Sequence, residues 1–131
     1  MSFFKKKLGY IANRIKIEEV PTSYDSIEVE TFSKPFAFNE LYMPLTDSYS
    51  LKKYGDRTTR MLRMFVPLKL WYGKIHVGDR AYLIDEDTNT YDLGNMIFND
   101  NKYCNEANYK VVSVEVQHIK LKVEFEKIKE N

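Results

Sequence analysis

The chain contains two histidines and one cysteine, which are side chains that often act as nucleophiles, bases or metal ligands. A tetrahedral zinc site needs four ligands, so His76, His118 and Cys104 would require distant carboxylates to complete one. A nucleophilic cysteine needs a nearby base to form its thiolate, and neither histidine is close to Cys104 in the sequence. Because both histidines adjoin predicted turns, we interpret them as solvated turn residues. We therefore expect neither a zinc site nor a catalytic cysteine.

One acidic segment resembles the start of a calcium-binding loop. Asp85, Asp87 and Asn89 occupy its first, third and fifth positions. The pattern then fails, because the sixth position is Thr90 instead of glycine and the twelfth is Met96 instead of a bidentate glutamate. We interpret the segment as an acidic, solvated loop and expect no metal there.

Other catalytic patterns are missing from the sequence. It has no glycine-rich phosphate loop and no G-x-S-x-G nucleophile motif. The carboxylate pair Glu124 and Glu126 falls on the exposed face of a predicted strand. A solvated carboxyl group keeps its ordinary pKa, so this pair is poorly placed for acid–base catalysis. We expect that the chain is not an enzyme and that it uses no cofactor.

The most functional-looking group of residues is a basic cluster that includes an aromatic side chain. Its members are Lys52, Lys53, Tyr54, Arg57, Arg60 and Arg63. Such a cluster can meet phosphates or an acidic partner, or it can be a solvated segment whose charges prevent edge-to-edge aggregation. We also expect Tyr42, Met43 and Tyr49 to be exposed nearby. Because aromatic residues, Met and Arg are enriched at interfaces, the combination favours a partner-facing surface, which could meet protein or DNA.

Size and composition indicate one globular domain over residues 1–131. Of the 131 residues, 44% are hydrophobic and 30% are charged, which permits a substantial core. The net charge of +1 is too small for a protein that binds nucleic acid regardless of sequence. A single cysteine excludes an internal disulfide, and no run of about 18 apolar residues suggests a membrane span. We expect a soluble, intracellular protein without a signal peptide.

The aromatic composition and the spacing of apolar residues favour β-structure. Ten Tyr, eight Phe and one Trp accompany only five Gly, and aromatic residues suit strands. The expected strands cover residues 14–20, 26–31, 57–66, 80–84, 108–116 and 119–126. Pro35 and Pro44 lack the backbone donor of a ladder, so the stretch around them is expected to be an edge strand or loop. The fold class is mostly β, a small antiparallel β-barrel or sandwich with long loops.

Two of these strands carry more detailed expectations. The apolar phase slips between Val111 and Val112, which indicates a β-bulge or an exchange of faces at a barrel corner. In the last strand Leu121, Val123 and Phe125 alternate with charged residues, so we expect one face in the core and the other in water.

Three segments are expected outside the strands. Apolar residues spaced three and four apart near the N-terminus predict a short helix or arm over residues 1–13. Residues 45–60 are predicted to be a long loop, and residues 85–107 a polar insertion.

Three features follow one another in the second half of the sequence. Val77-Gly78-Asp79 precedes the strand at 80–84, Asn108-Tyr109-Lys110-Val111-Val112-Ser113-Val114 follows, and a terminal strand runs from Leu121 to Ile128. This order resembles the small head-closure, or head–tail connector, proteins in the neck of tailed bacteriophages. The early strand at residue 14 and the long loop before Arg57 also fit that layout. The insertion at 85–107 and the aromatic segment at 32–42 depart from compact members of the family.

The resemblance implies a non-enzymatic structural protein of the virion neck, assembled in the host cytoplasm. Copies of the chain would form a ring that binds a portal-side adaptor protein on one side and a tail-side protein on the other, without a membrane. The family's long loop, at residues 45–60 here, would reach toward the channel and help to retain packaged DNA.

A second hypothesis is a small barrel that binds oligonucleotides. Exposed Tyr82, Tyr109 and Phe125 would then stack on bases, and the strand from Arg57 to Arg63 would follow the backbone. The strand phase places Phe125 with Leu121 and Val123, which opposes this hypothesis.

Overall fold

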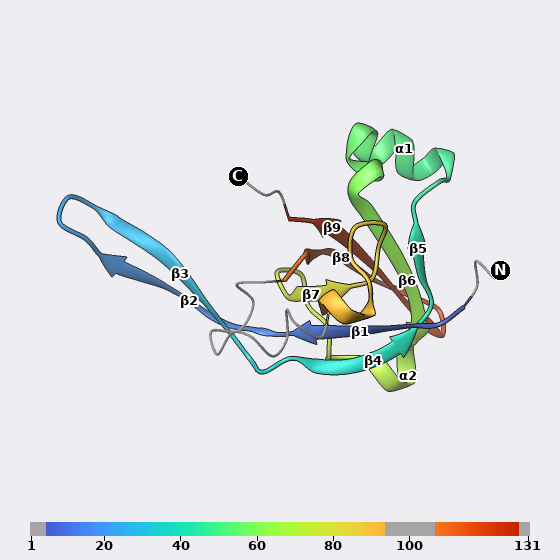
Figure 1. Ribbon diagram of the computed structural model, residues 1–131, viewed down its shortest axis with the longest axis horizontal. Helices are drawn as coiled ribbons and strands as arrows, with labels where there is room; N and C mark the ends of the chain where they lie inside the picture. Colours follow the sequence, from blue (N-terminus) through green and yellow to red (C-terminus); the bar gives the residue numbers. More distant parts are fainter. Residues whose placement is uncertain (1–4, 94–106, 129–131) are drawn as a thin grey trace.

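A computed structural model describes residues 5–93 and 107–128. Seven strands form one antiparallel sheet in the order β4-β1-β7-β8-β9-β6-β5, and β2 and β3 form a separate two-stranded ribbon (Figure 1). The strands are β1 Lys7–Ala12, β2 Arg14–Pro21, β3 Ser26–Phe32, β4 Phe36–Glu40, β5 Tyr42–Pro44, β6 Met61–Pro67, β7 Arg80–Leu83, β8 Tyr109–Gln117 and β9 Lys120–Lys127. The helical elements are α1 Ser48–Tyr54, the 3-10 helix η1 Gly55–Arg60 and α2 Leu68–Trp71, and residues 90–93 are also helical. The mostly β, antiparallel prediction is confirmed.

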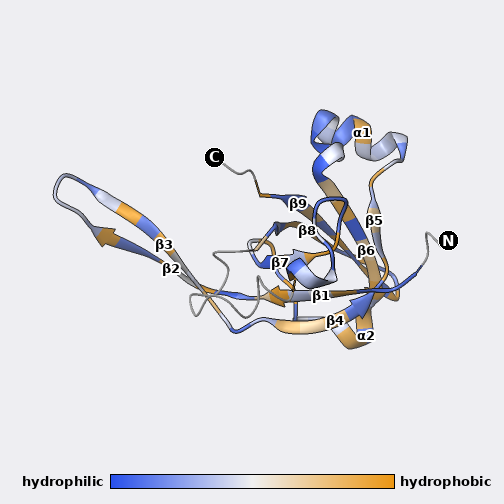
Figure 2. Ribbon diagram, in the orientation of Figure 1, coloured by the Kyte–Doolittle hydropathy of each residue, from blue (hydrophilic) through white to orange (hydrophobic). Residues whose placement is uncertain are grey.

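The large sheet curls around its own core without closing into a barrel. Its two edge strands, β4 and β5, are separated by Leu41 alone, so the sheet edges approach each other at that corner. The Phe38 ring packs there against the rings of Tyr42 and Trp71, with centroids 6.1 and 5.7 Å apart respectively. As Figure 2 shows, apolar residues gather along the strands of this body. The predicted edge position of the proline-flanked strands is confirmed.

The N-terminal segment is a strand, so the helical prediction for residues 1–13 is wrong for Lys7–Ala12. β1 pairs with both β4 and β7 inside the sheet. Gly9 allows this close packing, because a Cβ at that position would come within 2.4 Å of the Phe38 ring. Residues 1–4 of the predicted element lie outside the described residues.

The predicted long loop at 45–60 is mostly helical. Asp47 caps α1 by accepting hydrogen bonds from the Ser50 N–H at 3.1 Å and the Ser50 hydroxyl at 2.7 Å. Gly55, with φ +59°, ends α1 and leads into η1. The predicted strand over residues 57–66 therefore begins only at Met61, as β6. Of the predicted insertion, residues 94–106 lie outside the described part.

The last strand, β9, lies inside the sheet between β8 and β6, and both of its faces are covered. Leu121, Val123 and Phe125 face the core as predicted. The charged face is not solvated, because α1 and η1 cover part of it and leave Glu124 only 1% exposed. The prediction of a water-facing side is therefore wrong. The phase slip predicted between Val111 and Val112 is confirmed as a bulge, because the register of β8 with β9 shifts between Val111 and Ser113.

Candidate assembly interface

The ribbon of β2 and β3 extends away from the body as a hairpin arm, residues 14–32 (Figure 1). β2 follows β1 and β3 precedes β4, so the four strands form one long hairpin. Its β1–β4 half belongs to the large sheet, and its β2–β3 half is the arm. At the junction the Asn13 N–H donates to Ser33 Oγ at 2.9 Å, and the Ser33 N–H donates to the Asn13 carbonyl at 2.7 Å. The eight residues of β2 reach about 26 Å at about 3.3 Å per residue.

A buried carboxylate fixes the root of this arm. Asp79 accepts hydrogen bonds from Asn13 Nδ2 at 2.7 Å, the Arg14 N–H at 2.9 Å and the His76 N–H at 2.8 Å. Next to it, Gly78 has φ +98°, and a Cβ there would lie 2.5 Å from the Arg14 guanidinium carbon. The root is therefore a tight, polar mount that sets the direction of the arm.

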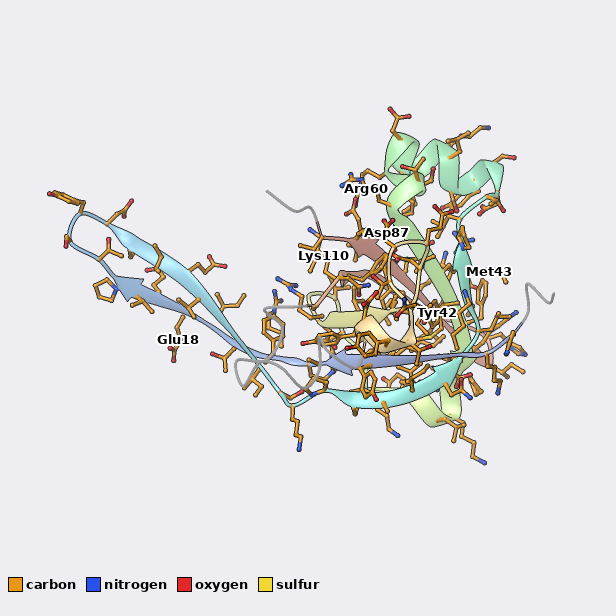
Figure 3. The ribbon with its side chains drawn as sticks, in the orientation of Figure 1. Glu18, Tyr42, Met43, Arg60, Asp87 and Lys110 are labelled. Carbon is orange, nitrogen blue, oxygen red and sulfur yellow. The ribbon has the colours of Figure 1, made fainter. Side chains whose placement is uncertain are left out.

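The register of the ribbon sorts its side chains onto two faces. Val20 lies opposite Ile27, and Glu18 lies opposite Val29, so the three apolar residues Val20, Ile27 and Val29 share one face with Glu18, and we call this the apolar face. Every side chain described between Arg14 and Thr31 is exposed, including Ile27 at 55%. Figure 3 shows Glu18 on the arm, away from the body. A two-stranded ribbon without cover is marginally stable in water, so its apolar face is a candidate interface.

The arm is also acidic. It holds five acidic and two basic residues, a net charge of −3. On the second face Glu19 lies directly opposite Glu28, a pairing of like charges that destabilises an isolated ribbon. A basic partner surface would relieve this repulsion.

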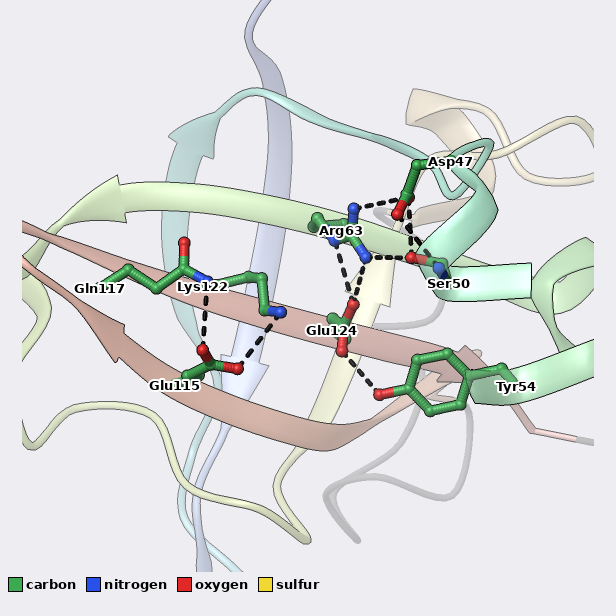
Figure 4. A network of polar contacts seen from close by, with 8 residues as sticks. All are labelled: Asp47, Ser50, Tyr54, Arg63, Glu115, Gln117, Lys122 and Glu124. Carbon is green, nitrogen blue, oxygen red and sulfur yellow. Dashed lines mark hydrogen bonds and ion pairs between the residues drawn. The ribbon is translucent and has the colours of Figure 1, made fainter. Parts of the chain in front are cut away.

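Most of the predicted basic cluster has a different role. Arg63 on β6 binds Glu124 at 2.6 Å and Asp47 at 3.0 Å, and it also donates to Ser50 Oγ (Figure 4). The Tyr54 hydroxyl donates to the second oxygen of Glu124 at 2.6 Å. These contacts fasten α1 to β6 and β9.

Glu126 extends this network under η1. It accepts two hydrogen bonds from Arg57, each 2.9 Å long, and pairs with Arg60 at 3.5 Å. We call the whole set the polar clamp, which comprises Asp47, Ser50, Tyr54, Arg57, Arg60, Arg63, Glu124 and Glu126.

The clamp shifts the titration of both glutamates. Burial alone would raise the pKa of Glu124, but the hydrogen bonds from Tyr54 and Arg63 outweigh it and hold that pKa below its usual value. Hydrogen bonds from Arg57 lower the pKa of Glu126 against a smaller effect of burial. Both carboxylates are therefore held in the ionised form by internal cations.

The remaining predicted site residues are divided between surface and core. Lys52, Lys53 and Tyr49 are exposed on α1, and Met43 is half-buried. Tyr42 is fully buried, so its predicted exposure is wrong. Its hydroxyl donates to the Leu8 carbonyl and accepts from the Ile84 N–H, both at 2.8 Å, and burial raises its pKa to about 12. Figure 3 labels Tyr42 and Met43 on the body, far from the arm.

The acidic segment at residues 85–89 is only partly solvated. Asp85 accepts from the Tyr109 hydroxyl at 2.6 Å and pairs with Lys127 at 3.3 Å, and Asp87 pairs with Lys127 at 2.7 Å. These residues line a cleft of about 390 Å³, to which Thr58 and Thr59 also contribute. Among the described residues, no group of three or more His, Cys, Asp or Glu side chains is placed to hold a metal ion.

The aromatic side chains proposed for base stacking lie in the core. Tyr82, Tyr109 and Phe125 are all buried. The oligonucleotide-binding hypothesis therefore loses the platform on which it depended.

The arm was not predicted as a candidate interface from the sequence, although both of its strands were. The available signal was the combination of apolar residues and acidic residues in a pair of strands joined by a short turn at residues 22–25.

Within residues 5–93 and 107–128, no helix is both long enough and apolar enough to cross a membrane.

Comparisons with known proteins identify no relative of this chain. No protein-family model matches it, and neither curated proteins nor solved structures show significant similarity to it.

Proposed function

We propose that the chain is a non-enzymatic structural protein of the neck of tailed bacteriophages. Copies would form part of a ring that joins the portal or its adaptor to the tail and helps to retain packaged DNA. The ring would reside in the virion after assembly in the host cytoplasm.

The observation that carries this proposal is the hairpin arm. Its apolar face is exposed over the length of the ribbon, while its root is held by the buried Asp79. An uncovered ribbon on a fixed mount suits a partner that completes the arm during assembly. An arm that binds a different surface on the next copy makes a head-to-tail contact, and such contacts close into rings.

The charge distribution is consistent with a ring around DNA. The net charge of +1 would let DNA pass through a channel without strong attachment. Lys52 and Lys53 are the cations of the predicted cluster that remain exposed on α1, so we assign α1 to the DNA or to a neck protein other than this chain.

The proposal is tested by disrupting the gene in its genome of origin and imaging the lysate by negative-stain electron microscopy. Separate tails and DNA-free heads are expected. Supplying the intact gene in trans should restore joined particles, whereas a gene in which a short turn replaces residues 15–31 should not. Joined particles in the absence of any intact copy would overturn the neck role.

A further inference from the structure

We propose that the hairpin arm of one copy docks on the surface formed by α2 and the β8–β9 turn of a second copy. This acceptor surface consists of Phe65, Lys69, Leu70, Ile119 and Lys120. The inference rests on the proposed ring, for which it names the partner surface.

The acceptor surface is a connected part of the body. The Leu68 N–H at the start of α2 donates to the Ile119 carbonyl at 3.0 Å, which joins α2 to the turn. Trp71 is buried and Leu68 packs against the core, so Lys69 and Leu70 remain on the outer side of this single helical turn. On the adjoining strand, Lys120 Nζ lies 5.0 Å from the centre of the Phe65 ring.

Its large apolar side chains are exposed together. Ile119 is 74% exposed, Leu70 is 59% exposed and Phe65 is 46% exposed. Ile119 follows His118, a non-glycine residue held at φ +57° in the two-residue turn between β8 and β9. A two-residue hairpin turn requires a positive φ, and this turn places Ile119 at the tip of the hairpin. These features are typical of a surface that is covered in an assembly.

The chemistry of the acceptor surface complements that of the arm. Lys69 and Lys120 supply positive charge beside the apolar groups, and the arm carries a net charge of −3 beside its own apolar face. Val20, Ile27 and Val29 would make the contact, while the carboxylates on the reverse face would attract the lysines through space. The exposed face of α1 fits less well, since Tyr49 and Leu51 are its only large apolar groups.

The position of the two surfaces makes the contact intermolecular. The arm leaves one end of the molecule, and α2 lies toward the other end (Figure 1). The arm is anchored at Asp79 and projects away from α2, so a chain does not cover its own acceptor. Two different surfaces on each copy give a head-to-tail contact of the kind that a ring requires.

Cross-linking tests the contact directly. In a Cys104→Ser background, the chain carrying Val29→Cys and Ile119→Cys is treated at high concentration with a short thiol-specific cross-linker. We expect a ladder of trimers and larger products, because each copy is joined at two sites. The matched control replaces Ile119→Cys with Leu51→Cys on α1 and should give no such ladder. Dimers from a chain with Val29→Cys alone would indicate arm-to-arm pairing. Monomers in every variant would indicate that copies of the chain make no contact. Either result would overturn the inference.

A charge swap tests the electrostatic part. Glu19→Lys with Glu28→Lys, and separately Lys69→Glu with Lys120→Glu, should each weaken association at least tenfold in sedimentation at low salt. Combining all four substitutions should recover most of that loss. Lys52→Glu with Lys53→Glu is the control and should leave association unchanged. Failure of the combined variant to recover would overturn the pairing of these two surfaces.

The two proposals can fail separately. Cross-linking along the arm and acceptor, together with normal particles after gene disruption, would keep the inferred contact and remove the neck role. Separated heads and tails without arm–acceptor cross-links would keep the neck role and show that the arm binds a different protein.

Discussion

The polar clamp buries charged side chains, whereas the hairpin arm exposes apolar ones. In the clamp, charged side chains are buried and satisfied within the chain, so that Glu124 meets both Arg63 and Tyr54. In the arm, apolar side chains such as Ile27 are exposed and have no cover within the described residues. The clamp completes its contacts internally, whereas the arm leaves its apolar face for another surface.

This difference identifies which region carries information about function. A run of arginines by itself suggests an external partner, but three of these arginines neutralise carboxylates of β9. Their removal should affect stability before it affects binding. Changes on the arm should affect binding before they affect stability.

The largest loss of stability is expected for Arg63→Met. The substitution leaves Glu124 buried without its ion-pair partner, which costs about 3 to 5 kcal/mol of unfolding free energy. Denaturant titration measures the effect. The control is Arg57→Met, whose half-exposed pair with Glu126 should contribute only about 1 kcal/mol or less. Equal losses in the two variants would contradict the distinction between the buried and the exposed part of the clamp.

A smaller loss is expected for Asp79→Asn at the root of the arm. An amide offers a single acceptor oxygen to three donors and places its own donors among them, which costs about 1 to 3 kcal/mol. Hydrogen exchange should show faster exchange at the Arg14 and His76 amides. Asp87→Asn, at an exposed ion pair, is the control and should change stability by less than about 1 kcal/mol. Unchanged amide exchange rates at Arg14 and His76 in Asp79→Asn would show that Asp79 does not fix the root of the arm.

Acid should lower the unfolding free energy by less than either substitution, through protonation of the clamp carboxylates. The pKa values of Glu124 and Glu126 are lowered in the folded state, so their contribution to stability is complete above the ordinary glutamate pKa of 4.5 and is lost as pH falls through the lowered values. Unfolding free energies measured from neutral pH to about pH 3 should therefore decline in the acidic range. Glu124→Gln should reduce that slope. A slope identical to that of the intact chain would exclude Glu124 as its source.

Much of the sheet could be predicted from the sequence. The period of two located β2, β3 and β9 to within about two residues, because alternation is set by the pleat itself. The bulge near Val112 was predictable for the same reason, since a phase slip requires an extra residue.

Tertiary cover was the part that could not be predicted. Alternation shows that Glu124 and Phe125 face opposite ways, but it does not show that a helix lies over the Glu124 side. The helical spacing of Leu8 and Ile11 was overridden by pairing with β4 and β7 on either side. The candidate site was misplaced for the same reason, because Arg63 finds its carboxylate 61 residues away in the sequence.

The smallest effect on stability, and the sharpest test of the comparison, is expected on the arm. Ile27→Ser with Val29→Ser changes exposed side chains and should alter unfolding free energy by no more than about 0.5 kcal/mol. The same pair should weaken self-association by at least about tenfold, because these side chains lose water contact only in the assembly. Ile17→Ser, on the opposite face, is the control and should weaken it far less. Sedimentation equilibrium measures association and denaturant titration measures stability. If both faces mattered equally, the arm would be enclosed on two sides; if neither did, the exposed apolar face would have no role in self-assembly.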